Sequence, residues 1–232
     1  MHGGLVADVQ ELLDWYDEKR DSIKARLAEF SVMREASDER WFSEMAFCIL
    51  VADGNARTGA KVQKDLEASG MLYTGNYSGL MRIVRPVRYN TSKARYILHD
   101  RKALTFQGMV NIKAKVLKEW GLKDSTARKV RDKIASDKVH FLGLGMKEAS
   151  HFLRNVGYGA NLAILDVHIL TLMKEHGILP KRFCGECIKR PSSMSSYHEV
   201  EDVFVSWAED LDIPPAHLDL VLWSFRTGEV FK

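Results

Sequence analysis

The sequence predicts an all-α protein, and three observations support this fold class. Apolar residues recur at intervals of three and four in runs such as 9–16 and 41–50, the spacing that gives a helix one apolar face. Few stretches alternate apolar and polar residues with a period of two, as a half-buried strand does. Residues that interrupt regular structure divide the chain into segments of helical length.

These interruptions give the order of the expected helices. Glycine permits positive φ and proline removes an amide donor, so helices tend to end near them. The interruptions lie at 70–79, at the Arg85-Pro86 step, at Gly121, at Gly143 and Gly145, at 157–159 and at 179–196. The sequence has neither an internal repeat nor a low-complexity tail. With 232 residues, 46% of them hydrophobic, we expect one globular unit, 1–232.

The sequence also lacks membrane and secretion signals. No apolar run approaches the roughly 20 residues that a membrane-spanning helix needs. The start, Met1-His-Gly-Gly-Leu, does not have the basic and apolar regions of a signal peptide. We therefore expect an intracellular protein without a membrane partner.

The three cysteines, Cys48, Cys184 and Cys187, are too few for a disulfide framework. Cys184 and Cys187 form a single C-x-x-C pair. A structural zinc ion normally has four ligands and an iron–sulfur cluster four thiolates, and no histidine stands at a recognisable spacing from the pair. We expect a loop with two thiols, no metal held by side chains, and no cofactor.

The net charge of +3 conceals an uneven distribution. Residues 82–133 carry fifteen Lys and Arg against four Asp and Glu, whereas 199–219 carry seven acidic residues and no Lys or Arg. Basic segments bind nucleic acid by displacing counterions from its phosphates, although a charged run is also typical of a solvated helix face. The distribution favours a nucleic-acid partner for 82–133.

The most informative motif is Phe141-Leu-Gly-Leu-Gly-Met-Lys147, with Asp166 nineteen residues after the lysine. Gly143 and Gly145 permit two short helices to meet closely, and the start of the second helix offers unpaired amides that suit a phosphate. Lys147 is expected in the first turn of that helix. A lysine becomes a nucleophile when it is desolvated or lies near other cations, because its amine is then less fully protonated.

Each part of this motif also has an ordinary structural interpretation. Lysines in a first helical turn are usually solvated, an aspartate before an apolar run is commonly an N-cap, and Gly-x-Gly hairpins occur in modules that only bind DNA. The occurrence of hairpin, lysine and aspartate together, in this order, favours a catalytic pair of Lys147 and Asp166.

In its order and spacing the motif resembles the helix-hairpin-helix superfamily of DNA glycosylases. The resemblance implies that Lys147 is the attacking amine, that Asp166 assists it, and that Gly143 and Gly145 contact DNA. It also implies two helical subdomains flanking a DNA-binding cleft. The helix-hairpin-helix and the lysine would occupy about 134–157, and the N-terminal and C-terminal parts would form a joint helical subdomain.

Four separated blocks resemble one branch of the superfamily, the type-2, archaeal-type 8-oxoguanine DNA glycosylases. The blocks are Glu44–Leu50, Arg88–Ile97, 141–170 and the C-terminal stretch Leu218–Lys232. The resemblance implies that the final residue, Lys232, contacts the oxidised guanine and that Trp223 stacks on it. Core packing is the ordinary alternative for Trp223.

The remaining candidates are neighbours of these motifs. His151 lies one helical turn after Lys147 and is a candidate wall for a flipped base, although a partly exposed helix histidine is equally typical. A group of polar residues suits the DNA backbone or the unpaired opposite base, unless they are ordinary surface residues: Arg88, Asn90, Lys93 and Arg95. The superfamily resemblance further implies a monovalent cation at three hairpin carbonyls, those of Val139, Phe141 and Leu144.

The implied function is base-excision repair by a bifunctional glycosylase that removes 8-oxoguanine. Lys147 would attack C1′ of a flipped nucleotide and form a Schiff base, Asp166 would support the positive charge developing on the sugar, and β-elimination would nick the strand. The expected partner is double-stranded DNA containing oxidised guanine. We expect a monomer located with the DNA inside the cell, which in a prokaryotic source means the cytoplasm or nucleoid.

Two rival functions stay open at this point. A DNA-binding hairpin module without enzymatic activity needs the glycines and the basic segment but neither Lys147 nor Asp166. A glycosylase for oxidised pyrimidines would share the lysine and the aspartate but not the C-terminal stretch. Changes confined to the end of the chain therefore distinguish these functions.

Overall fold

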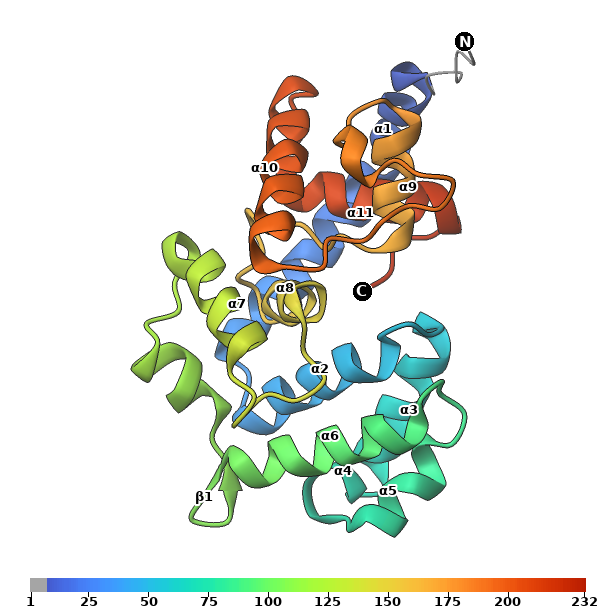
Figure 1. The fold of residues 1–232 in the computed structure, drawn as a ribbon. Helices are drawn as coiled ribbons and strands as arrows, with labels where there is room; N and C mark the ends of the chain where they lie inside the picture. The colour runs from blue at the N-terminus through green and yellow to red at the C-terminus, as the bar shows by residue number, and fades with distance from the viewer. Residues whose placement is uncertain (1–7) are drawn as a thin grey trace. The chain divides into compact units, whose positions relative to one another are not determined.

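The computed structural model describes residues 8–232 (Figure 1). Its helices and strands are α1 (Val9–Val32), α2 (Asp38–Val51), α3 (Ala56–Ala68), α4 (Met71–Thr74), α5 (Tyr77–Val84), α6 (Asn90–Ala103), β1 (Thr105–Phe106), β2 (Met109–Val110), α7 (Ala127–Ser136), α8 (Met146–Asn155), α9 (Val167–Glu175), α10 (Met194–Asp210) and α11 (Pro215–Thr227). Short 3₁₀ turns are η1 (Met33–Glu35), η3 (Asp124–Thr126) and η4 (Lys181–Phe183), and η2 (Ala114–Glu119) is a π-helical turn. The predicted all-α fold class is confirmed.

The chain divides into two compact units. One, which we call the terminal unit, combines the described part of Met1–Ser31 with Gly159–Lys232. The other, the middle unit, is Val32–Tyr158. The middle unit contains the glycine hairpin and Lys147, and the terminal unit contains Asp166 and the end of the chain.

The core of the middle unit is built around α2, which packs against α3, α6 and α8. The run Trp41–Leu50 is buried throughout, so α2 is covered on every side. The carboxylate of Glu44, a buried residue of α2, accepts hydrogen bonds from Gln63 of α3 (3.2 Å) and Asn155 of α8 (3.0 Å). These bonds satisfy a buried charge and link three helices, including the one that carries Lys147.

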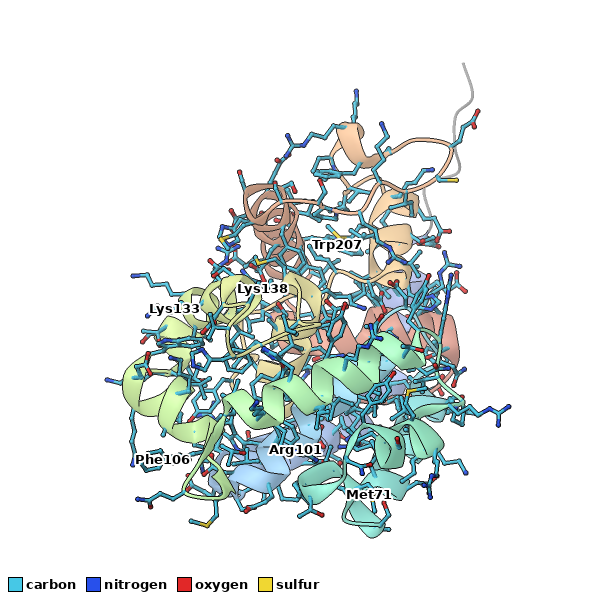
Figure 2. The ribbon with its side chains drawn as sticks, turned by 60° about the horizontal axis from the view of Figure 1, so that its bottom comes forward. Met71, Arg101, Phe106, Lys133, Lys138 and Trp207 are labelled. Carbon is cyan, nitrogen blue, oxygen red and sulfur yellow. The ribbon has the colours of Figure 1, made fainter. Side chains whose placement is uncertain are left out.

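A small antiparallel hairpin, β1–β2, follows α6 and was not expected from the sequence. Thr105 pairs with Val110 and Phe106 with Met109, and the two turn residues between them have positive φ, as a tight two-residue turn requires. Figure 2 labels Phe106, whose side chain is exposed. Strands with two paired residues are too short to produce a period-two pattern.

In the terminal unit, α11 packs against α9 and α10. Helix α1 joins them through two aromatic residues whose polar atoms find partners on α11. The indole N–H of Trp15 donates to Ser224 Oγ (3.0 Å), and the hydroxyl of Tyr16 forms a hydrogen bond with Nδ1 of His217 (2.9 Å). The unit is therefore closed by contacts between distant parts of the sequence.

Three further features concern membrane spans, metal sites and cysteines. Within residues 8–232, no helix has the length and apolar character needed to cross a membrane. Over the same residues, His, Cys, Asp and Glu side chains form no group of three or more that could hold a metal ion. Cys48 is buried, and Cys184 and Cys187 are free thiols after η4. The thiol of Cys184 donates to the Leu179 carbonyl (3.4 Å).

Candidate active site

The glycine hairpin connects the end of α7 at Ser136 to the start of α8 at Met146. Gly143 has φ of 74°, a conformation that L-residues other than glycine rarely adopt. A Cβ added at Gly143 would also lie 2.5 Å from Cδ2 of Tyr96, which is closer than any real contact. Glycine is therefore required at this position for two independent reasons, one conformational and one steric.

Lys147 is the second residue of α8 and lies in its first turn, as expected. Its Nζ forms an ion pair with Oε1 of Glu148 (3.0 Å), and its side chain is 24% exposed. The other oxygen of Glu148, Oε2, accepts the amide of Gly145 (3.2 Å) and so caps the helix start. The amine is therefore partly buried and held next to the hairpin.

Lys93 differs from the expectation that it faces DNA. It is 4% exposed, and its Nζ donates to the carbonyls of Leu50 (2.9 Å) and Ala52 (2.6 Å) at the end of α2. Burial lowers the pKa of Lys93 to about 8, and the charge of Lys147 acts in the same direction. Lys93 is therefore a buried cation that is close enough to Lys147 for their charges to interact. In this conformation its ammonium does not face a phosphate.

The other DNA-contact candidates of the middle unit are more accessible. The guanidinium of Arg88 lies over the ring of Tyr89 (4.7 Å), and Arg95 is exposed on α6. Asn90 begins α6, and its amide nitrogen donates to the carbonyl of Arg85 (3.1 Å). Arg88 and Arg95 remain available to a phosphate, whereas the side-chain amide of Asn90 is already hydrogen-bonded to the preceding turn.

His151 lies on α8 and packs edge-on against Phe47 of α2, with ring centroids 5.6 Å apart. It is only partly exposed. This contact corresponds to the ordinary interpretation of a helix histidine that contributes to packing. Its role as a wall of a base pocket remains a prediction.

The carbonyls proposed to hold a monovalent cation are already partly engaged. The ammonium of Lys138, labelled in Figure 2, donates to the Leu144 carbonyl (3.0 Å) and to the Ala135 carbonyl (2.5 Å). A metal cation at Leu144 would lie against this ammonium and be repelled by it. In this conformation the Lys138 ammonium occupies the Leu144 carbonyl, and the cation expected at Val139, Phe141 and Leu144 stays a prediction.

In the terminal unit, Asp166 is the N-cap of α9, and its Oδ1 accepts the amide of Ile169 (2.9 Å). The segment before it has no regular secondary structure and is held by buried polar side chains of α10 and α11. Glu201 accepts the amide of Ala163 (3.1 Å), and Asp219 accepts that of Ile164 (3.1 Å). These bonds fix the position of Asp166, and they join residues too distant in the chain for sequence reasoning to have paired them.

The chain end turns back onto α11. Gly228, with φ of 83°, ends the helix, and the ring of Phe231 then stacks on Trp223 with centroids 6.1 Å apart and planes 27° apart. Trp223, Phe231 and Lys232 are all partly exposed. The stack places the chain end beside the aromatic residue predicted to read the base, and it was not anticipated from the sequence.

The structure thus brings the hairpin, Lys147 and Lys93 together in the middle unit. In the terminal unit it brings Trp223 together with the end of the chain, and it fixes Asp166 at the start of α9. These arrangements provide an amine beside a potential phosphate site, a fixed carboxylate, and a partly exposed aromatic surface next to the terminal residue.

Comparisons with known proteins agree with the motif resemblance. Residues 23–213 match the protein family described as Ogg-HhH, 8-oxoguanine DNA glycosylase. The protein of Methanocaldococcus jannaschii named 8-oxoguanine DNA glycosylase/AP lyase is 31% identical over 230 residues, which cover 98% of this chain and 99% of that protein. The protein of the same name from Metallosphaera sedula is 35% identical over 227 residues, covering 92% of this chain and 94% of that protein.

A solved structure is similar over nearly the whole chain. It is the crystal structure of the Methanocaldococcus jannaschii 8-oxoguanine glycosylase/lyase in complex with a 15mer DNA containing 8-oxoguanine. Its TM-score is 0.79 at 30% sequence identity, and the match covers 96% of this chain and 100% of that chain. The resemblance inferred from the motifs is confirmed, and the chain belongs to the 8-oxoguanine DNA glycosylase family.

Proposed function

We propose that this protein removes 8-oxoguanine from double-stranded DNA and cleaves the resulting abasic site, with Lys147 as the nucleophile. The observation that carries this proposal is the position of Lys147 in a member of this family. It lies in the first turn of α8, partly buried and directly after the glycine hairpin. A helix start offers amides to a phosphate, so a DNA strand held there passes close to the amine.

The proposed reaction begins with attack of the unprotonated Lys147 amine on C1′. The N–C1′ bond forms as the glycosidic bond breaks, and the base leaves with the electron pair and takes up a proton. Loss of a proton from nitrogen and opening of the sugar ring then give the Schiff base. Removal of a C2′ proton expels the 3′ phosphate and nicks the strand. The steps use side chains of the protein and DNA, so no cofactor is required.

Asp166 and the chain end have separate roles in the proposal. The carboxylate of Asp166 stabilises the positive charge that develops on the sugar. Base recognition is assigned to Trp223, which would stack on the flipped base, and to Lys232. 8-Oxoguanine carries an N–H donor at N7 where guanine has an acceptor, so a group that accepts from N7–H distinguishes the two bases.

The nucleophile is tested by borohydride trapping on a duplex containing 8-oxoguanine. The wild-type protein should give a covalent adduct, and Lys147→Gln should bind the duplex without giving one. Lys64→Gln, which changes an exposed lysine of α3, is the matched control and should trap normally. An adduct that persists in Lys147→Gln would assign the nucleophile elsewhere, and a wild-type protein that traps only on oxidised pyrimidines would overturn the substrate assignment.

We also propose that the protein acts inside the cell as a monomer on duplex DNA. One copy supplies the hairpin, Lys147, Asp166 and the chain end, so the proposed chemistry needs no second subunit. Sedimentation of the free protein and of its complex with a short lesion duplex checks this. A 2:1 protein–DNA complex at concentrations that support full activity would contradict it.

A further inference from the structure

The glycine hairpin rests on one face of α6. Tyr96 and Asp100 are four residues apart on that helix and therefore point to the same side. The ring of Tyr96 lies directly against Gly143, and Oδ1 of Asp100 accepts the amide of Leu142 at 2.8 Å. Two consecutive residues of the turn are thus held by side chains of a helix that ends about forty residues earlier in the chain.

Asp100 is an unusual residue to find at such a position. Its side chain is fully buried. Oδ1 also lies 3.0 Å from Nδ1 of His99, whereas Oδ2 has no hydrogen-bond partner among residues 8–232. Burying a carboxyl group costs free energy unless its oxygens are satisfied. A leucine would fill the same space without that cost but could not hold the Leu142 amide.

The charge state of Asp100 is consistent with a role as a hydrogen-bond acceptor. Burial raises the pKa of Asp100 to about 8; the Leu142 amide and the charge of Lys138 oppose this rise, and Asp137 adds to it. At neutral pH the group is therefore mostly a neutral acid, and its carbonyl oxygen still accepts from Leu142. Asparagine reproduces this neutral form, so it is the conservative replacement.

Other ties to the hairpin come from within its own loop. Asp137 accepts the amides of Val139 (2.9 Å) and His140 (3.1 Å), and Lys138 holds the Leu144 carbonyl. These bonds shape the loop and tie it to the end of α7, but they do not attach it to a helix outside the hairpin. The bond from Asp100 does, and it acts in the centre of the turn.

We propose that Asp100 is a positioning residue for the hairpin: by holding the Leu142 amide it fixes the turn, and the first turn of α8 behind it, in the position that receives a DNA phosphate. The proposal rests on the proposed function in one respect, namely that the hairpin contacts DNA. Lys147 is five residues after Leu142, so a displaced turn also misplaces the amine. The main loss expected is in DNA binding, because the hairpin supplies amides to the phosphate rather than chemistry.

The attachment itself is tested by hydrogen exchange of the full-length protein, without DNA. In the wild type the Leu142 amide should exchange as slowly as buried amides of α6. Asp100→Leu should speed its exchange roughly 10-fold or more, the scale of one lost hydrogen bond, and Asp100→Asn should restore protection. Fast exchange of Leu142 in the wild type would overturn the proposal, and this measurement uses the wild-type protein alone.

The consequence for DNA is tested by equilibrium binding to an undamaged duplex, followed by kinetics on the lesion. Asp100→Leu should weaken binding roughly 10-fold and raise KM more than it lowers kcat, and Asp100→Asn should bind like the wild type. The matched control is Leu80→Ala, which removes a buried side chain of α5 and lowers stability without touching the hairpin bond. Equal losses of DNA affinity in Asp100→Leu and Leu80→Ala would mean that Asp100 contributes to stability alone.

These outcomes are distinguishable from failure of the proposed function. Exchange and binding to undamaged duplex require neither excision nor a Schiff base. If the wild type gives no borohydride adduct but Asp100→Leu loses binding selectively, the positioning role stands and the enzymatic assignment falls. If trapping succeeds and Asp100→Leu binds normally, the enzymatic assignment stands and the positioning role falls.

Discussion

At the scale of single residues, Asp166 combines a structural and a proposed chemical role. Its Oδ1 caps α9 through the Ile169 amide, which any side chain with a well-placed oxygen can do. Its negative charge is what the proposed reaction needs. The two roles can be separated, because asparagine and serine cap helices without carrying a charge.

We predict that Asp166→Asn and Asp166→Ser keep nearly wild-type melting temperatures but lose roughly 10²-fold in the rate of excision, the scale of one preorganised electrostatic group. Single-turnover excision from an 8-oxoguanine duplex and thermal melting measure the two effects. A folded Asp166→Asn protein with near-normal excision would leave Asp166 as a helix cap only.

Asp100 makes the stability of the protein depend on pH in a defined direction. Its pKa is raised from 3.8 to about 8 in the folded protein, chiefly by burial, so the folded state binds this proton more tightly than the unfolded state. The contribution of Asp100 to the free energy of unfolding therefore falls as pH rises from about 4 to about 8. Above about pH 8 the buried carboxyl is ionised, and the loss of stability is complete.

We predict that the free energy of unfolding of Asp100→Asn, relative to wild type, increases as pH is raised across this window and levels off above it. Urea denaturation at several values between pH 5 and 9 measures the difference. Taking the difference cancels titrating groups that do not contact Asp100, whereas His99, which lies 3.0 Å from it, is part of the measured effect. A difference that stays constant with pH would show that Asp100 titrates near its ordinary value.

At the scale of elements, the hairpin and the chain end are each set by a contact with a neighbouring helix. Gly143 lies against Tyr96 of α6, and Phe231 stacks on Trp223 of α11. Both segments contain a glycine with positive φ that redirects the backbone. Changes at these contacts should therefore affect recognition more than they affect the cores of the two units.

For the hairpin, we predict that Gly143→Ala destabilises the protein both through the positive φ, which costs about 1–2 kcal/mol, and through the clash with Tyr96. In a Tyr96→Ala background the second part should disappear, so the same substitution should cost less by about 1 kcal/mol or more. A double-mutant cycle of unfolding free energies measures this. Strictly additive effects would mean that Tyr96 moves aside freely.

For the chain end, we predict that deleting Lys232, or appending a few residues after it, lowers 8-oxoguanine excision roughly 10-fold or more. Either change leaves the edge of the base unpaired at a cost of about 1–3 kcal/mol. Cleavage at a preformed abasic site should change much less, because it requires Lys147 but no base recognition. Comparing the two activities is the measurement, and equal losses in a folded protein would remove Lys232 from base recognition.

At the scale of the whole molecule, the basic segment 82–133 is not uniformly directed at solvent. Several of its cations donate to backbone carbonyls or are buried within the middle unit, among them Lys93, Arg101, Lys113 and Arg131. Arg101, for example, donates to the carbonyls of Met71 and Leu72. The charge available to DNA is therefore smaller than the sequence count suggests.

We predict that duplex binding still weakens steeply with salt, by roughly 10-fold or more between 50 and 200 mM, because each neutralised phosphate releases counterions. Arg95→Gln, an exposed candidate, should reduce the slope of log affinity against log salt, whereas Arg101→Gln should lower stability with less effect on the slope. Fluorescence anisotropy at several salt concentrations measures this. An affinity that does not change with salt would contradict a phosphate-binding role for 82–133.

The sequence by itself determined the all-α fold class, the place of Lys147 in a first helical turn and the cap formed by Asp166. These features depend on residues within a few positions of each other, where helix period, glycine φ and N-cap chemistry operate. The family resemblance also followed from sequence, because it rests on motifs in fixed order.

Only the tertiary structure decided which charged side chains turn inward and what holds the motifs in place. Lys93 looked like a surface cation but caps α2, and Asp100 stood in a basic segment yet supports the hairpin from α6. Likewise, Glu201 and Asp219 lie in an acidic stretch but fix the segment before Asp166. Such contacts join residues tens of positions apart, and burial, which the local pattern does not specify, determines whether a charge binds DNA or supports the fold.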